Sequence, residues 1–234
     1  MRNDIPLKYS WANLRRGPGR RSGETSGMTA RPLFMSFCLA LLALGGCINL
    51  TKSYPEKHSY ALEAIRQGKT HASIPGTVLK IRKLRASPDF EGKELVYRTS
   101  DARYERDFYN EWFVPPNAML TQQLQNWLTS TGLFQYVMDS SGPLPATHLL
   151  EGTVTALYGD YRATPAKAAL GLHVLLIDPA KNPPAIVLQR DYRSDIPIAD
   201  RSPEALVQGW NTALRSIFDG LVDDLYKGLP HRQP

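Results

Sequence analysis

Side chains that could carry out chemistry are few in this sequence and widely spaced. No two histidines fall at the three- or four-residue spacing of a metal site on a helix; the five are His58, His71, His148, His173 and His231. No Gly-x-Ser-x-Gly elbow is present for a nucleophilic serine. Gly68-Lys69-Thr70 is similar to the end of a phosphate loop, but Glu63 stands where that loop begins with glycine. The sequence therefore predicts no catalytic residues, no metal site and no cofactor.

Cys47 is the residue whose surroundings do indicate a modification. An apolar run of 12 residues, 33–44, follows the basic Arg31 and leads to Gly45-Gly46-Cys47. A run this short is typical of a secretory signal, because a membrane-spanning helix needs about 20 apolar residues. Leu44-Gly45-Gly46-Cys47 resembles the bacterial lipobox, which implies cleavage between Gly46 and Cys47 and acylation of the Cys47 thiol. The alternative is an ordinary secretory signal with an incidental cysteine.

Lipidation at Cys47 would divide the chain into four parts. Residues 1–27 are expected to be a mis-assigned start or a disordered extension, 28–46 the signal peptide, 47–58 a polar tether and 59–229 a folded periplasmic domain. The second cysteine, Cys38, falls within the signal peptide, so the mature protein would contain no disulfide. The residue after Cys47 is Ile48, whereas an aspartate there commonly retains lipoproteins in the inner membrane. The expected location is the periplasmic face of the outer membrane.

The positive charge of the chain is concentrated in its N-terminal part. The formal net charge is +6, from 28 basic and 22 acidic residues. Residues 1–46 hold seven of the basic and two of the acidic residues, which leaves 21 and 20 in the remainder. A nearly neutral domain argues against nucleic acid as a partner, because nucleic-acid binding relies on a broad basic surface.

Hydrophobic periodicity in 59–229 predicts an α/β domain of the α+β type, with a mainly antiparallel sheet and two main helices. Strand patterns cover 76–84, a tyrosine-rich hairpin of 94–98 and 103–109, and a meander of 148–158, 168–177 and 185–196. His173 lies within an apolar strand and is expected to be a core or edge histidine. In the last strand, the residues expected on the buried face are Ile186, Leu188, Tyr192 and Ile196.

Two segments have helical spacing. The first begins at Pro115-Pro116 and ends at Gly132, a residue suited to a helix end. The second begins with Ser202 as N-cap and Pro203 in the first turn, and is long and amphipathic. Its acidic residues Asp219, Asp223 and Asp224 are expected to be exposed, which argues against membrane binding by this helix. Its expected buried stripe is Leu206, Trp210, Ala213, Leu214, Ile217, Leu221 and Leu225.

Four aromatic residues in and beside the predicted hairpin could form a surface for a lipid or a partner: Tyr97, Tyr104, Tyr109 and Trp112. Packing in the core and across the hairpin explains them equally well. The sequence leaves both interpretations open.

The order of these features resembles one known family. After the lipobox come Tyr60-Ala61-Leu62, the segment 90–98 (FEGKELVYR), Tyr109-Asn110-Glu111-Trp112, Pro115-Pro116 and Gly132-Leu133-Phe134. Together with Leu150-Glu151-Gly152 and the terminal helix, they are similar to the ABC-type transport auxiliary lipoproteins, the PqiC-like proteins associated with MCE-domain transport systems. The resemblance covers residues 47–228.

This resemblance implies a non-enzymatic lipoprotein that acts as a docking or exit component of an intermembrane lipid transport system. Its implied partners are a periplasmic MCE-domain protein and the ABC permease and ATPase of the inner membrane. A symmetric homo-oligomer is compatible with such a port. Two alternatives remain open at this point: a structural lipoprotein of another envelope assembly or secretion machine, and an envelope hydrolase, which the missing nucleophile motif disfavours.

Overall fold

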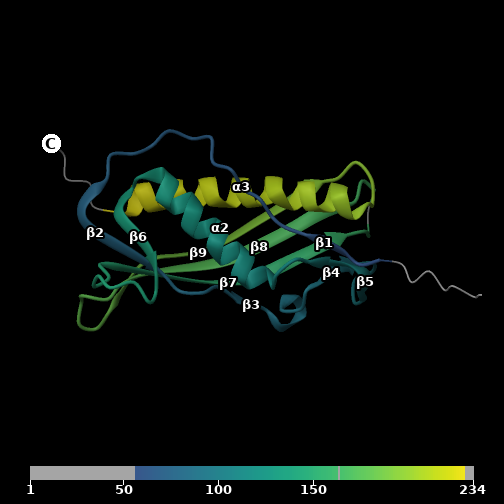
Figure 1. The fold of residues 1–234 in the computed structure, drawn as a ribbon, viewed down its shortest axis with the longest axis horizontal. Coiled ribbons are helices and arrows are strands. Elements are labelled where there is room, and N and C mark those ends of the chain that lie inside the picture. Colours follow the sequence, from purple (N-terminus) through teal and green to yellow (C-terminus); the bar gives the residue numbers. More distant parts are fainter. Residues whose placement is uncertain (1–55, 163, 230–234) are drawn as a thin grey trace, which may run out of the picture. The chain divides into compact units, whose positions relative to one another are not determined.

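The computed structural model describes residues 56–162 and 164–229. Within them, a nine-stranded sheet carries two helices on one face, α2 (Pro116–Thr131) and α3 (Pro203–Gly228) (Figure 1). The predicted signal peptide, the cleavage site at Gly46 and the lipidation site at Cys47 lie outside the described residues, so they stay predictions.

The strands follow the predicted pattern, and the structure adds three short strands and one 3-10 turn to it. Strands β1, β3 and β6 and the 3-10 turn η1 (Pro88–Phe90) were not expected from the sequence. The full set is β1 (His58–Tyr60), β2 (Ile74–Ile81), β3 (Arg85–Ala86), β4 (Glu94–Arg98), β5 (Tyr104–Trp112), β6 (Phe134–Asp139), β7 (His148–Asp160), β8 (Lys167–Asp178) and β9 (Ala185–Pro197).

The expectation of a mainly antiparallel sheet is wrong, because the sheet is mixed and five of the eight pairings between described strands are parallel. The physical reason is the length of β7, because its 13 residues give one edge along which several N-terminal strands can pair. β2, β3 and β4 do not pair with one another but lie in succession along one edge of β7, all parallel to it. The predicted hairpin β4–β5 and the meander β7–β8–β9 are antiparallel, as expected.

Both predicted helices are confirmed, together with the predicted start and end of α2 and the predicted start of α3. α2 starts at Pro116 and is closed by Gly132, whose φ of 68° places it in the left-handed region that favours glycine. In α3, the Ser202 hydroxyl accepts a hydrogen bond of 3.2 Å from the backbone N–H of Ala205, as an N-cap does. The seven residues of the predicted α3 stripe are all buried.

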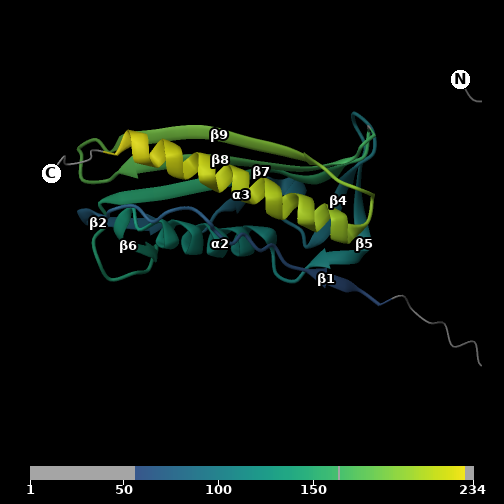
Figure 2. The same ribbon diagram turned by 90° about the horizontal axis from the view of Figure 1, so that it is seen from above.

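α3 packs closely on β8 and β9, and Figure 2 shows it running along them. The Trp210 side chain is fully buried, and its Nε1–H donates a 3.0 Å hydrogen bond to the carbonyl of Ala169. Its ring centroid lies 5.1 Å from that of Trp112 in β5. Gly209 lies against Ala168, where an added Cβ would come within 2.6 Å of the Ala168 Cβ. The helix and the sheet therefore form one core.

Two residues of this layer differ from the sequence-based expectation. Ile186 is exposed rather than buried, because the pairing shifts between Leu176↔Leu188 and Ile177↔Ile186 and leaves an extra residue in β9. Asp224 is half-buried and accepts a 2.9 Å hydrogen bond from the Tyr192 hydroxyl, whereas Asp219 and Asp223 are exposed as expected.

His173 also takes part in a pair that the sequence did not reveal. Its Nδ1 lies 2.7 Å from Asp191 Oδ1 on the neighbouring strand, directly opposite in register. The side chain is partly exposed. It belongs to a cross-strand polar pair on the sheet surface.

Candidate functional site

The four aromatic residues that the sequence singled out do not form one surface. Trp112 is 1% exposed and lies in the core beneath Trp210. Tyr97 is half-buried, with its ring stacked 5.1 Å from that of Tyr161. Tyr104 and Tyr109 are exposed, at 46% and 42%. Only these two can meet a partner or a lipid without rearrangement of the fold.

The two exposed tyrosines have different neighbours. Tyr104 meets Tyr158 edge-on at 5.6 Å, and the Arg98 guanidinium lies 5.4 Å from the Tyr104 ring. Tyr109 meets Phe108 edge-on at 5.2 Å. The predicted aromatic surface therefore divides into a Tyr104 part and a Tyr109 part.

A large bulge in β5 carries the Tyr109 part. Between the pairs Glu94↔Glu111 and Val96↔Arg106, β4 advances by two residues and β5 by five. Such an irregularity bends a strand and redirects its side chains. The sequence gives one sign of it, since Asp107 interrupts the alternation of a strand in which two aromatic residues follow each other.

Asp107 closes the bulge with four hydrogen bonds. Its Oδ1 accepts from the backbone N–H groups of Tyr109 (2.8 Å) and Asn110 (3.0 Å). Its Oδ2 accepts from the Tyr97 hydroxyl (2.5 Å) and from Asn110 Nδ2 (2.8 Å). Burial alone would raise the pKa of Asp107, but these hydrogen bonds outweigh it and hold the pKa below its ordinary value. The carboxylate is therefore ionised and fully occupied within the fold.

The same polar network reaches α3 through Tyr60. The Tyr60 hydroxyl donates a 2.7 Å hydrogen bond to Glu204 Oε1 and lies 3.2 Å from Asn110 Oδ1. Burial, together with the bond to Glu204, raises the pKa of Tyr60 to about 12. Burial and the bond to Asp107 likewise raise the pKa of Tyr97. The network thus fixes the bulge to β1, β4 and the first turn of α3.

We name four exposed side chains beside this network the aromatic tip: Phe108, Tyr109, Phe113 and Val114. Phe108 and Phe113 are 71% and 68% exposed, and the sequence did not single out either. Phe113 and Val114 also border an apolar groove of about 320 Å³ that Leu62 and Met119 help to line.

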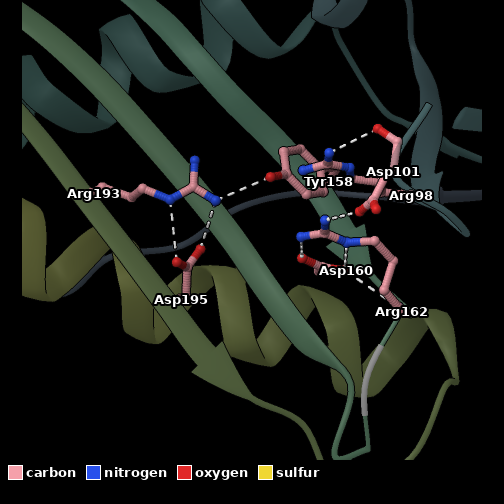
Figure 3. A network of polar contacts seen from close by, with 7 residues as sticks. All are labelled: Arg98, Asp101, Tyr158, Asp160, Arg162, Arg193 and Asp195. Atoms are coloured by element: carbon pink, nitrogen blue, oxygen red, sulfur yellow. Dashed lines mark hydrogen bonds and ion pairs between the residues drawn. The ribbon is translucent and has the colours of Figure 1, made fainter. Parts of the chain in front are cut away.

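A second polar cluster lies near the ends of β4 and β7 (Figure 3). Arg162 makes a two-pronged ion pair with Asp160, at 2.8 and 2.6 Å, and its Nη1 donates to Asp101 at 2.7 Å. Its hydrogen bonds to Asp160 and Asp101 raise the pKa of Arg162, and hydrogen bonds from Arg162 lower the pKa of Asp160. Arg98 donates from Nη2 to the carbonyl of Asp101 at 2.8 Å.

Figure 3 also shows Arg193, whose guanidinium group is likewise paired with a carboxylate of the fold. It pairs with both carboxylate oxygens of Asp195 and donates to the Tyr158 hydroxyl, each at 3.0–3.1 Å. The paired guanidinium groups of Arg162 and Arg193 are engaged by carboxylates of the fold itself. This cluster therefore fastens the loop at 99–103 and the sheet surface rather than offering a site for an anionic ligand.

Two further findings concern the described residues only. No group of three or more His, Cys, Asp or Glu side chains among residues 56–162 and 164–229 is placed to hold a metal ion. Of the helices in the same part of the chain, neither has the length and apolar character needed to cross a bilayer.

Two solved structures have a fold similar to that of this chain. A Xanthomonas campestris protein of family DUF330 superposes with a TM-score of 0.59 and 16% identity, over 73% of this chain and 96% of its own. A second crystal structure, of an uncharacterized protein, gives a TM-score of 0.58 and 19% identity over 73% and 99%. At such identities the similarity establishes the fold.

Comparison at the level of sequence identifies the family. No curated protein matches the chain. Residues 60–222, from the end of β1 to the last turns of α3, match the model of one family. That family consists of transport lipoproteins and is not a family of enzymes. The chain belongs to the ABC-type transport auxiliary lipoprotein component family, as its sequence motifs had indicated.

Proposed function

We propose that this auxiliary lipoprotein is anchored through Cys47 in the outer membrane, faces the periplasm, and acts as the docking or exit component of an MCE-associated intermembrane lipid transport system. The observation that carries the proposal is the family match over residues 60–222, which begins 13 residues after the lipobox cysteine. A tether of that length leads directly from the predicted anchor into the transport domain.

A bridging partner is needed for such a role. A compact domain of the size of 59–229 has a radius of gyration of roughly 16 Å. It therefore stays close to the membrane to which it is tethered. The MCE-domain protein is the proposed bridge to the permease and ATPase of the inner membrane.

Tyr104 is the proposed centre of the partner surface. It is exposed, and Arg98 and Tyr158 pack around it. Tyrosine and arginine are enriched at the centres of protein interfaces, because they bury much area and keep a polar group for hydrogen bonding. Trp112 is excluded from this surface by its burial.

Site-specific photo-crosslinking in cells tests both the partner and the surface. A benzoylphenylalanine at position 104 is expected to crosslink to an MCE-domain protein encoded beside this gene. Tyr136 in β6 is the matched control, because it is the same residue type and is 48% exposed against 46%. Equal or absent crosslinking at the two positions would argue against the proposal.

A further inference from the structure

We infer that the aromatic tip, Phe108, Tyr109, Phe113 and Val114, enters the headgroup layer of the phospholipid bilayer that holds Cys47. The inference deepens the proposed function and rests on its lipid anchor. It assigns the tip one occupant, the membrane surface, and gives the domain a fixed orientation on that surface.

Exposure is the first argument. Phe108 and Phe113 leave most of their ring surface in water, although both are large and carry no polar group. Exposed apolar side chains that lie together mark interaction sites, and the tip holds two such pairs, Phe108 beside Tyr109 and Phe113 beside Val114 on one groove. Phenylalanine and tyrosine with a neighbouring lysine are typical of protein segments that lie in the interfacial layer of a membrane.

The construction of the bulge is the second argument. Phe108 and Tyr109 project at a point where the ladder between β4 and β5 is interrupted, and where Asp107 satisfies two backbone N–H groups that the ladder leaves free. The side chains of Tyr97 and Asn110 complete that support. The hydrogen bonds of Asp107 therefore hold Phe108 in an exposed position, where most of its ring makes no contact with the core.

Distance from the anchor is the third argument. Nine residues, 48–56, separate Cys47 from Lys57. A chain of this length spans at most about 36 Å when fully extended, and roughly 17 Å on average as a flexible coil. The tip flanks β1, the first described strand after this segment: Lys57 Nζ, just before β1, is 5.2 Å from the Phe108 ring, and the Phe113 N–H donates to the carbonyl of Tyr60, the last residue of β1, at 2.8 Å.

Charge around the tip also suits a phospholipid surface. Lys57 and Lys93 both approach Glu111, at 3.0 and 3.5 Å, so this carboxylate is shared between two ammonium groups. Asp107 accepts four hydrogen bonds from neutral donors, which stabilise its negative charge without cancelling it. The two lysines balance the two carboxylates in formal charge, so the tip does not repel lipid phosphates, and the half-exposed Lys57 beside the Phe108 ring can pair with one.

A second copy of the chain fits the tip less well. Exposed fractions of 71%, 42%, 68% and 37% on side chains of about 150–250 Å² amount to roughly 400 Å². A stable protein interface buries about 800 Å² on each partner. The tip supplies about half of that area. Insertion into a membrane to which the domain is already tethered requires no such area.

Spin labelling of the mature lipoprotein in vesicles of phosphatidylethanolamine and phosphatidylglycerol tests the inference. Phe108→Cys and Phe113→Cys each place one label on the tip, and Ile186→Cys is the control, because it is also apolar and is 60% exposed. Labels at 108 and 113 are expected to collide readily with oxygen and poorly with a water-soluble nickel chelate. The label at 186 is expected to show the reverse.

Two results would overturn the inference. Labels at 108 and 113 that behave like the label at 186 would show that the tip remains in water. Labels shielded from both oxygen and the chelate would show that protein covers it. Failure of the proposed function is visible separately, because the mass of the N-terminal residue reports the anchor and crosslinking from position 104 reports the partner.

Discussion

Tyr60 donates a 2.7 Å hydrogen bond to Glu204, two residues that lie 144 positions apart in the chain. The bond joins β1, the first described strand, to the first turn of α3. Because Tyr60 also lies 3.2 Å from Asn110, β1, the β5 bulge and α3 are held as one unit. Contacts between the first strand and the last helix of the described domain thus fix the bulge that carries Phe108.

Replacing Trp210 by alanine tests the core beneath α3. The change removes a fully buried indole and its hydrogen bond to Ala169, so we expect a loss of about 3–5 kcal/mol in the free energy of unfolding. Urea denaturation of the mature protein in detergent measures it. Ile186→Ala, at an exposed position, is the control and should change the stability by less than about 0.5 kcal/mol.

Two glycines of α3 should respond to alanine in opposite directions. At Gly209 the new Cβ would lie 2.6 Å from Ala168 Cβ and 2.8 Å from Ile198 Cγ2, and such overpacking costs about 1–3 kcal/mol. At Gly220 the nearest atom is 3.7 Å away, so the higher helix propensity of alanine should stabilise the protein by about 0.5–1 kcal/mol. Thermal unfolding compares the two variants, and shifts of the same sign would refute the packing described for Gly209.

Asp107 should contribute to the pH dependence of stability. Its folded-state pKa is lowered, so its contribution is complete above the unfolded value of about 3.9 and is lost as the pH falls through the folded value. Asp107→Asn removes this contribution. The stability difference between wild type and variant, measured from pH 6 to pH 2.5, is expected to shrink at the acid end. A constant difference over that range would contradict the assigned role.

Cys47 is predicted to be the acylated N-terminal residue of the mature protein. Mass spectrometry of the processed N-terminus should find acyl chains on Cys47, and Cys47→Ser should release the protein from membranes. A chain that starts at Met28 should be processed like the full chain. An unmodified N-terminus at another residue would exclude the lipoprotein signal, and failed export from Met28 would assign a function to residues 1–27.

Local sequence patterns predicted the elements with regular periodicity. The capping residue Ser202 and the stripe that includes Trp210 and Leu221 located α3, and Pro116 with Gly132 located α2. These signals act over a few residues, so a linear sequence displays them.

Long-range pairing was not accessible in the same way. Strands of two or three residues such as β3 and β1 have no periodicity of their own, and their parallel pairing with β7 and β5 depends on residues far away in the chain. The shift that exposes Ile186 is likewise a property of the pair β8–β9 rather than of β9 alone.

The same limit applies to the candidate site. Composition drew attention to tyrosines 97, 104 and 109 and to Trp112, but their burial depends on long-range packing, such as that of Trp112 on Trp210 and of Tyr97 on Tyr161. Phe108 and Phe113 read as ordinary strand and loop residues in the sequence. The exposure of Phe108 depends on the irregular register of β4 and β5, and Phe113 is exposed just beyond the end of β5.

Co-purification from native membranes tests the central claim most directly. The mature lipoprotein, solubilised in mild detergent, is predicted to bring down an MCE-domain protein encoded beside it, and Tyr104→Ala should reduce the yield while Tyr136→Ala leaves it unchanged. The proposed role in intermembrane transport would be contradicted if no MCE-domain protein co-purified with the folded and acylated lipoprotein when both proteins were present at micromolar concentrations.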